Sequence, residues 1–148
     1  MAAAEPTYDR TDSNSRPLPT VQPLYHHKLV NCPGMSIIGV LVKFPPNGVS
    51  PPHRHGGASV SACLLQGTLH NKMNDDPMYT VQQGGTWLEK PGCHHKISAN
   101  VSATEPATIL ATFVIETEKM EREGHAILVQ VDEEYRDLVF PEPEGNML

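Results

Sequence analysis

The sequence lacks the features that mark membrane-spanning and nucleic-acid-binding proteins. No apolar run approaches the roughly 18–20 residues that cross a bilayer. Lysine and arginine number 11 against 17 aspartates and glutamates, and the net charge of −6 provides no basic surface for nucleic acid. The first twenty residues contain no apolar segment typical of a secretory signal. We therefore expect a cytoplasmic protein with neither a membrane nor a nucleic acid as its partner.

Cysteine is also scarce. Cys32, Cys63 and Cys93 are an odd number, lie far apart and form no CxxC pair. This pattern suits a reducing compartment better than a disulfide framework.

Proline and glycine, by contrast, are abundant and divide the chain into short segments. The 148 residues include 14 prolines and 11 glycines. Between them lie β-type runs such as "MSIIGVLVKF" (35–44), "ASVSACLLQG" (58–67) and "ATILATFVIE" (107–116). Short strands at even spacing are typical of an all-β sandwich or barrel.

Composition also predicts the domain organisation. Residues 1–20 are polar and without periodicity, so we expect a flexible N-terminal arm, then one β domain over residues 21–140 and a tail at 141–148. The segment 116–124 ("ETEKMEREG") has helix-forming composition but almost no apolar stripe, which predicts a short surface helix or a charged turn. "AILVQV" (126–131) is expected to form a late strand.

The histidines form the most informative pattern. In "PPHRHGGAS" (51–59), His53 and His55 are two residues apart, so on an extended strand they share one face while Arg54 points to the other. Neutral imidazole is the commonest metal ligand in proteins. Two ligands make half a site, and the pair is equally compatible with surface histidines in a proline-rich turn.

A second histidine pair, His94 and His95, follows the turn at Pro91-Gly92. Adjacent residues of a strand face opposite ways, so only one of the two can join the first pair. Three protein ligands with open positions for water or substrate is the arrangement of catalytic metal sites.

These two segments resemble the two motifs of the cupin family. "GVSPPHRHGGASVSACLLQG" (48–67) resembles the first motif, and "GGTWLEKPGCHH" (84–95) resembles the second, which places a third histidine after a Pro-Gly turn. The resemblance covers about residues 35–115. It implies a single cupin-type antiparallel β-barrel, also described as a double-stranded β-helix or jelly roll, that holds one divalent metal ion. It makes His53, His55 and His95 the ligands and leaves His94 in a non-ligand position.

The chain departs from the family at the fourth ligand. The usual glutamate of the first motif falls on Val60, or on Ser59 with an alternative spacing. Valine cannot bind a metal and serine is a poor ligand, so we expect a three-histidine site whose fourth position is left to Ser59 or water. Three neutral imidazoles leave the full charge of the ion available to an anionic ligand. They do not distinguish zinc, iron, nickel, manganese and copper.

The surroundings of the proposed ion can be sketched from strand parity. If Val60 points inward, so does Ala62, and both then line a small apolar cavity. Trp87 either stacks on a substrate or packs as a core or barrel-end aromatic residue. His70 and Glu89 are candidate catalytic acid–base groups, each with a plainer alternative: a surface histidine and a solvated strand end.

By this resemblance we expect a mononuclear metal enzyme acting on a small organic substrate that chelates through oxygen atoms. Non-redox chemistry of the isomerase, lyase, dehydratase or decarboxylase type is favoured. A three-histidine Fe(II) dioxygenase and a non-catalytic metal- or ligand-binding module are the alternatives, because the fold does not determine the reaction. The resemblance also implies a homodimer in which residues 20–32 cross to the partner barrel.

Overall fold

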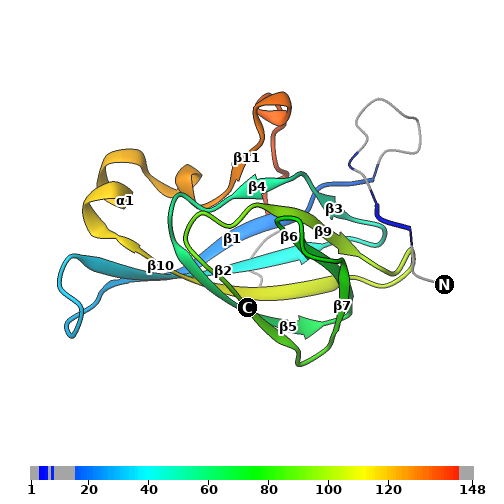
Figure 1. Ribbon diagram of the computed structural model, residues 1–148, viewed down its shortest axis with the longest axis horizontal. Coiled ribbons are helices and arrows are strands. Elements are labelled where there is room, and N and C mark those ends of the chain that lie inside the picture. Colours follow the sequence, from blue (N-terminus) through cyan, green and yellow to red (C-terminus); the bar gives the residue numbers. More distant parts are fainter. Residues whose placement is uncertain (1–3, 7, 9–15, 144–148) are drawn as a thin grey trace.

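A computed structural model describes residues 4–6, 8 and 16–143 of the chain (Figure 1). Most of the predicted arm at 1–20 and the end of the predicted tail at 141–148 lie outside the described residues. Two antiparallel sheets make up the domain. The first contains, in spatial order, β1 (Thr20–Lys28), β2 (Met35–Phe44), β10 (Ala107–Glu116), β5 (Ser59–Gln66) and β8 (Thr86–Glu89). The second contains β11 (Gln130–Val131), β4 (His53–Arg54), β9 (His95–Asn100), β6 (Thr68–Met73) and β7 (Tyr79–Gln82), and β3 (Val49–Ser50) also pairs with β9.

The predicted all-β fold class is therefore confirmed. Every strand pairing among the described residues is antiparallel. Hydrogen bonding leaves the two sheets separate and does not close them into one continuous barrel, which is consistent with a jelly roll. Among the described residues, no helix has the length and apolar character needed to cross a bilayer.

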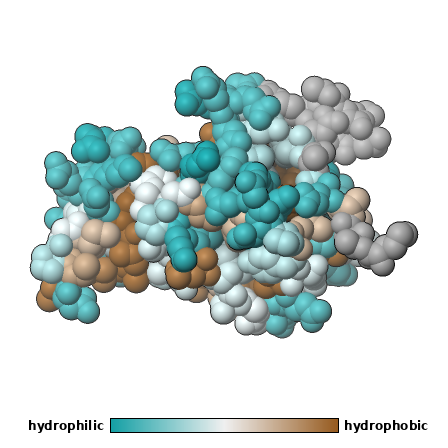
Figure 2. All heavy atoms as spheres, in the orientation of Figure 1, coloured by the Kyte–Doolittle hydropathy of each residue, from teal (hydrophilic) through white to brown (hydrophobic). Residues whose placement is uncertain are grey.

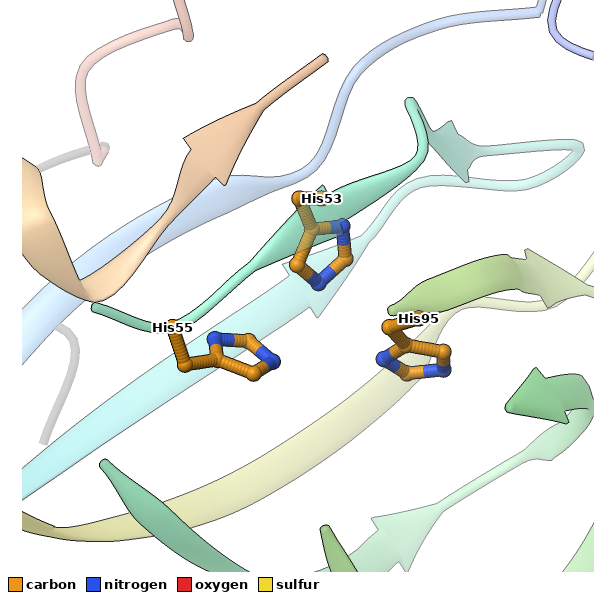
Figure 3. Close-up of side chains that lie close together, drawn as sticks. All are labelled: His53, His55 and His95. Atoms are coloured by element: carbon orange, nitrogen blue, oxygen red, sulfur yellow. The ribbon is translucent and has the colours of Figure 1, made fainter. Parts of the chain in front are cut away.

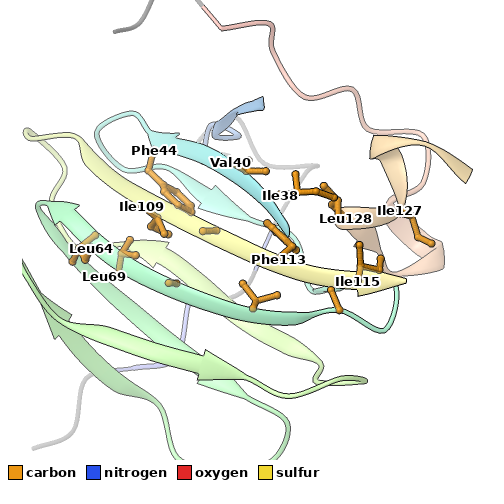
Figure 4. Packing of buried hydrophobic residues seen from close by; sticks show 14 of the residues in the cluster. Ile38, Val40, Phe44, Leu64, Leu69, Ile109, Phe113, Ile115, Ile127 and Leu128 are labelled. Carbon is orange, nitrogen blue, oxygen red and sulfur yellow. The ribbon is translucent and has the colours of Figure 1, made fainter. Parts of the chain in front are cut away.

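The hydrophobic core lies on the inner face of the first sheet (Figure 4). Strands β5 and β10 alternate over most of their length between buried and more exposed side chains, as expected for a sheet that covers a core on one face, whereas β2 buries four consecutive residues at 38–41. On β5 the predicted parity is confirmed, since Val60, Ala62 and Leu64 are buried and Ser61 is exposed. Leu69 and Val81 extend this core from the second sheet.

The segment after β10 agrees only in part with the sequence prediction. The predicted short helix is α1 (Thr117–Glu123), which buries only Met120. The late strand predicted for residues 126–131 is wrong over its first half, where a 3-10 helix, η1 (His125–Leu128), precedes the two residues of β11. Ile127 and Leu128 are adjacent and both buried, which a helical turn permits and an alternating strand does not. A second 3-10 helix, η2 (Glu133–Tyr135), follows β11.

Polar and apolar residues are separated on the surface of the domain. In Figure 2 polar residues cover α1 and the segment after β11, whereas apolar residues show beneath α1, where β10 ends. β1 is an edge strand of the first sheet. The homodimer predicted through residues 20–32 stays a prediction.

The segment just before β1 is attached to the domain by Arg16. This side chain donates hydrogen bonds from Nε to the Asn47 carbonyl (2.8 Å) and from Nη2 to the Asn100 carbonyl (2.6 Å).

Gly67, which joins β5 to β6, provides a test of how closely this turn packs against the segment before β10. Its φ of +87° is strained for any other residue, and an added Cβ would lie 2.6 Å from the Pro106 carbonyl oxygen. We expect Gly67→Ala to lower the free energy of unfolding by about 2–4 kcal/mol, measured by urea denaturation. Gly84→Ala is the matched control, because Gly84 has a φ of +85° but nothing within 4 Å of its added Cβ. Equal losses in the two variants would contradict the proposed collision.

Candidate metal centre

The three histidines predicted as ligands come together between the two sheets. His53 on β4 and His95 on β9 are direct partners across the strand pair, and their ring centroids are 5.0 Å apart. His55 follows β4, and its ring centroid lies 4.8 Å from that of His53. All three side chains are buried, and their candidate ligand atoms lie within 4.8 Å of one another. One ring nitrogen of each points into the same space (Figure 3), whereas Arg54 is exposed on the opposite face.

Backbone carbonyls determine which ring nitrogens of His53 and His55 are available to bind a metal. His53 Nδ1 lies 2.7 Å from the Pro51 carbonyl oxygen, and His55 Nδ1 lies 2.7 Å from the Leu128 carbonyl oxygen. A carbonyl oxygen only accepts hydrogen bonds, so each Nδ1 carries a proton, and in the neutral imidazole Nε2 presents the lone pair. Metal-binding histidines are commonly oriented by such a bond from their other ring nitrogen.

The side chain of Asn71 on β6 determines which ring nitrogen of His95 is available to bind a metal. Its Oδ1 lies 3.1 Å from His95 Nε2, which therefore donates and leaves Nδ1 with the lone pair. Sequence reasoning missed Asn71. Its position two residues after Leu69 in the run "TLHNKM" (68–73) was the available signal, because alternate residues of a strand share a face and both side chains are buried on β6.

Glu89, predicted as a candidate catalytic residue, is buried beside the same histidines. Its Oε1 lies 3.0 Å from His55 Nε2 and 3.4 Å from His95 Nδ1, and its Oε2 accepts a hydrogen bond from Trp87 Nε1 at 3.1 Å. Only 3% of its surface is exposed. The alternative interpretation of Glu89 as a solvated strand end is therefore wrong.

The protonation states suit a cation. Burial, reinforced by the neighbouring imidazoles, holds the pKa of His53 well below its usual value, and burial lowers the pKa of His95 to about 4. Burial alone would raise the pKa of Glu89, but His95 and His55 outweigh it and lower this pKa to about 2. At neutral pH the imidazoles of His53 and His95 are therefore neutral and the Glu89 carboxylate is ionised. Deprotonated nitrogen and oxygen donors are the form that a divalent ion requires, so the residues fit a bound metal.

These pKa values also predict how stability depends on pH in the metal-free protein. The unfolded chain protonates His95 near pH 6.5, whereas the folded chain resists protonation down to about pH 4. Stability is therefore full above pH 6.5 and falls as the pH drops toward 4, by about 3 kcal/mol at roughly 1.4 kcal/mol per pKa unit. Urea unfolding in the presence of a chelator, at several pH values, measures this loss. A parallel series on His95→Gln should have a shallower slope; equal slopes would assign the loss to other groups.

The remaining predicted residues divide between the site and the outer surface. Val60 and Ala62 line a cavity of about 80 Å³ next to the histidines, as their parity predicted, and Trp87, whose role the sequence left open, lines it as well. The structure does not bring His70 to the cluster. It lies between the buried residues Leu69 and Asn71, so it points to the opposite face, where its Nδ1 is 3.3 Å from Thr80 Oγ1. This placement corresponds to the surface alternative.

His94 also lies apart from the cluster, as expected from its non-ligand position. Its Nε2 lies 2.9 Å from Asp132 Oδ1, which ties β9 to the segment after β11.

The cavity beside the cluster has mostly apolar walls, which include Val40, Val42, Ile109, Ala111, Phe113 and Leu128.

Residues 40–113 match the family described as "Cupin domain". This match covers half of the chain and includes both histidine motifs. The chain belongs to the cupin family.

Solved structures support the fold assignment of this cupin. The Schizosaccharomyces pombe Cnp3 cupin domain aligns with a TM-score of 0.54 and 19% identity over 70% of this chain and 66% of that one. A cupin domain from Bordetella pertussis aligns with a TM-score of 0.54 and 16% identity, over 68% and 97%. A Cupin 2 conserved barrel domain protein from Salinispora arenicola aligns with a TM-score of 0.52 and 18% identity, over 70% and 81%. This cupin thus spans slightly under two thirds of the first of these chains. No curated protein matches its sequence.

Proposed function

We propose that this cupin is a mononuclear metal-dependent enzyme that transforms a small organic molecule by non-redox chemistry, of the isomerase, lyase, dehydratase or decarboxylase type. The observation that carries the proposal is the donor set itself. Three buried imidazoles, each held by a hydrogen bond on one nitrogen, direct the other nitrogen into one space. A bound divalent ion would polarise a carbonyl or carboxylate oxygen of the substrate and stabilise the negative charge that develops there.

The residues around the cluster define what the site accepts. Val60 and Ala62, with the apolar side chains beside them on β10 and β2, give the cavity an apolar wall and leave room only for a compact ligand. A carbonyl or carboxylate oxygen directed at the histidines would place the apolar part of the ligand against these walls. This arrangement supports a small, oxygen-chelating substrate better than a highly hydroxylated one.

Metal analysis combined with O₂ uptake tests the proposal. The purified protein is analysed for bound elements, then incubated with β-dicarbonyl, hydroxycarboxylate and catecholic compounds while O₂ and products are monitored. A redox-inert ion, with product formed at constant O₂, is the expected result. Iron with substrate-dependent O₂ uptake would instead identify a dioxygenase. A tightly held ion without turnover would identify a binding module. Either outcome would overturn the proposed chemistry, and His53→Ala serves as the metal-free control in each assay.

A further inference from the structure

We propose that Glu89 supplies the carboxylate ligand that the first motif of this chain lacks, and that its Oε1 binds the metal ion together with His53, His55 and His95. The inference rests on the proposed function in requiring a bound ion. It goes further in assigning the donor set and the charge of the site.

Strand register explains how the carboxylate can change position without leaving the site. Val60 on β5, where the family usually has its glutamate, is the direct partner of Glu89 on β8. Side chains directly opposite in an antiparallel pair lie on the same face, with Cβ atoms about 4.5–5.5 Å apart. Both residues line the same cavity, and both are buried. A carboxylate on either strand therefore reaches the same space.

The contacts of Glu89 are favourable when a positive charge, either a proton or a metal ion, lies between its carboxylate and the histidines. His55 Nδ1 donates its proton to the Leu128 carbonyl, so in the neutral imidazole the Nε2 lone pair faces Glu89 Oε1 at 3.0 Å, and only a second proton would make this contact a hydrogen bond. Likewise, His95 Nε2 donates to Asn71, and the Nδ1 lone pair faces the same oxygen at 3.4 Å. Lone pairs this close repel each other unless a positive charge lies between them. One ion between the three atoms would turn both contacts into attractions.

The distances also match those between ligands of one ion. Nitrogen and oxygen ligands at about 2.0–2.2 Å from a tetrahedral or octahedral ion are separated from each other by roughly 3.0–3.5 Å. The separations of 3.0 and 3.4 Å fall within this range. Trp87 Nε1 holds Oε2, so the carboxylate is oriented with only Oε1 directed at the histidines. Ligating carboxylates are typically held by such an outer hydrogen bond.

The assignment changes the expected chemistry. One carboxylate lowers the net charge of a divalent ion with three neutral imidazoles from +2 to +1, which tightens metal binding and weakens the pull on an anionic substrate. It also commits Oε1 to the ion. The general-base role predicted for Glu89 is therefore replaced here by a ligand role.

A set of variants tests the assignment through metal binding rather than activity. Zinc affinity is measured by competition with a chelator, and coordination by the visible spectrum of the Co(II)-substituted protein. Glu89→Gln should weaken zinc binding by about 100-fold or more and change the Co(II) spectrum. Val60→Glu combined with Glu89→Gln, which returns the carboxylate to the opposite strand, should recover most of the affinity. Glu116→Gln, at an exposed glutamate, is the matched control and should behave as wild type.

The outcomes separate this inference from the proposed function. If wild type binds zinc but Glu89→Gln binds it equally well with an unchanged Co(II) spectrum, Glu89 is not a ligand and the three-histidine site stands. If wild type binds neither ion, both proposals fail. Should Glu89→Gln not fold, an infrared difference spectrum of wild type with and without zinc provides the decision. A carboxylate stretch that shifts on zinc binding supports the assignment, and its absence overturns it.

Discussion

Replacing His95 with alanine is expected to abolish stoichiometric metal binding. His95 is the one histidine of the cluster that β9 provides, and it is the direct strand partner of His53. Its removal takes away one donor and enlarges the space beside His53, His55 and Glu89, so the remaining groups would hold the ion much less tightly. The loss should reach about 100-fold in affinity or more, beyond the range typical of outer-shell changes. Elemental analysis after dialysis measures it as metal per chain.

His70→Ala is the matched control for this experiment. It removes the same side chain from the opposite face of the sheet, where His70 contacts Thr80 rather than the cluster. Its metal content should equal that of wild type. Circular dichroism establishes that both variants are folded. If His95→Ala kept a full equivalent of metal, the ligand assignment would be wrong, and a loss in His70→Ala would point to a second site.

Phe113→Ala should cause the largest loss of stability. Phe113 lies on β10 at the middle of the first sheet and is 2% exposed. Its ring centroid is 5.4 Å from that of His55, in an edge-on arrangement. Truncation of a buried phenylalanine to alanine costs about 3–5 kcal/mol, a large share of the roughly 5–15 kcal/mol that stabilises a typical domain. Urea denaturation of the metal-free protein measures the change.

The same variant also tests how the core supports the site. Because the Phe113 ring packs against His55, its loss should allow the imidazole to move and should weaken zinc binding as well. Val114→Ala is the control, since Val114 is the next residue on β10, points to the other face and is only partly buried. It should cost about 1 kcal/mol or less and leave zinc affinity unchanged. Equal effects of the two variants would contradict the inward packing of Phe113.

Local alternation explains which features could be predicted from the sequence. His53 and His55 share a face, and Val60 and Ala62 share another, because side-chain direction repeats every two residues along a strand. The all-β fold followed from short β-branched runs between proline and glycine turns. The third histidine came from the family resemblance, and the structure places it opposite His53.

Features that depend on strand pairing could not be predicted in this way. Parity within one strand leaves two possible faces for His70 and for Glu89, and only the pairing with neighbouring strands selects between them. The carbonyls of Pro51 and Leu128 and the amide of Asn71 come from three different parts of the chain, so no local pattern connects them to the histidines. The compact η1 turn likewise depends on burying Ile127 and Leu128 together.

The sequence by itself therefore determined the fold class, the three histidines and the apolar wall, all of which depend on short-range periodicity or on a motif. Only the tertiary structure decided that a buried carboxylate accompanies those histidines. Glu89 is 29 residues from Val60 in the chain, yet the β5–β8 register makes them direct neighbours. In the sequence, Val60 appears as the loss of the family's carboxylate. In the folded protein, the carboxylate of Glu89 lies directly opposite it on the adjacent strand.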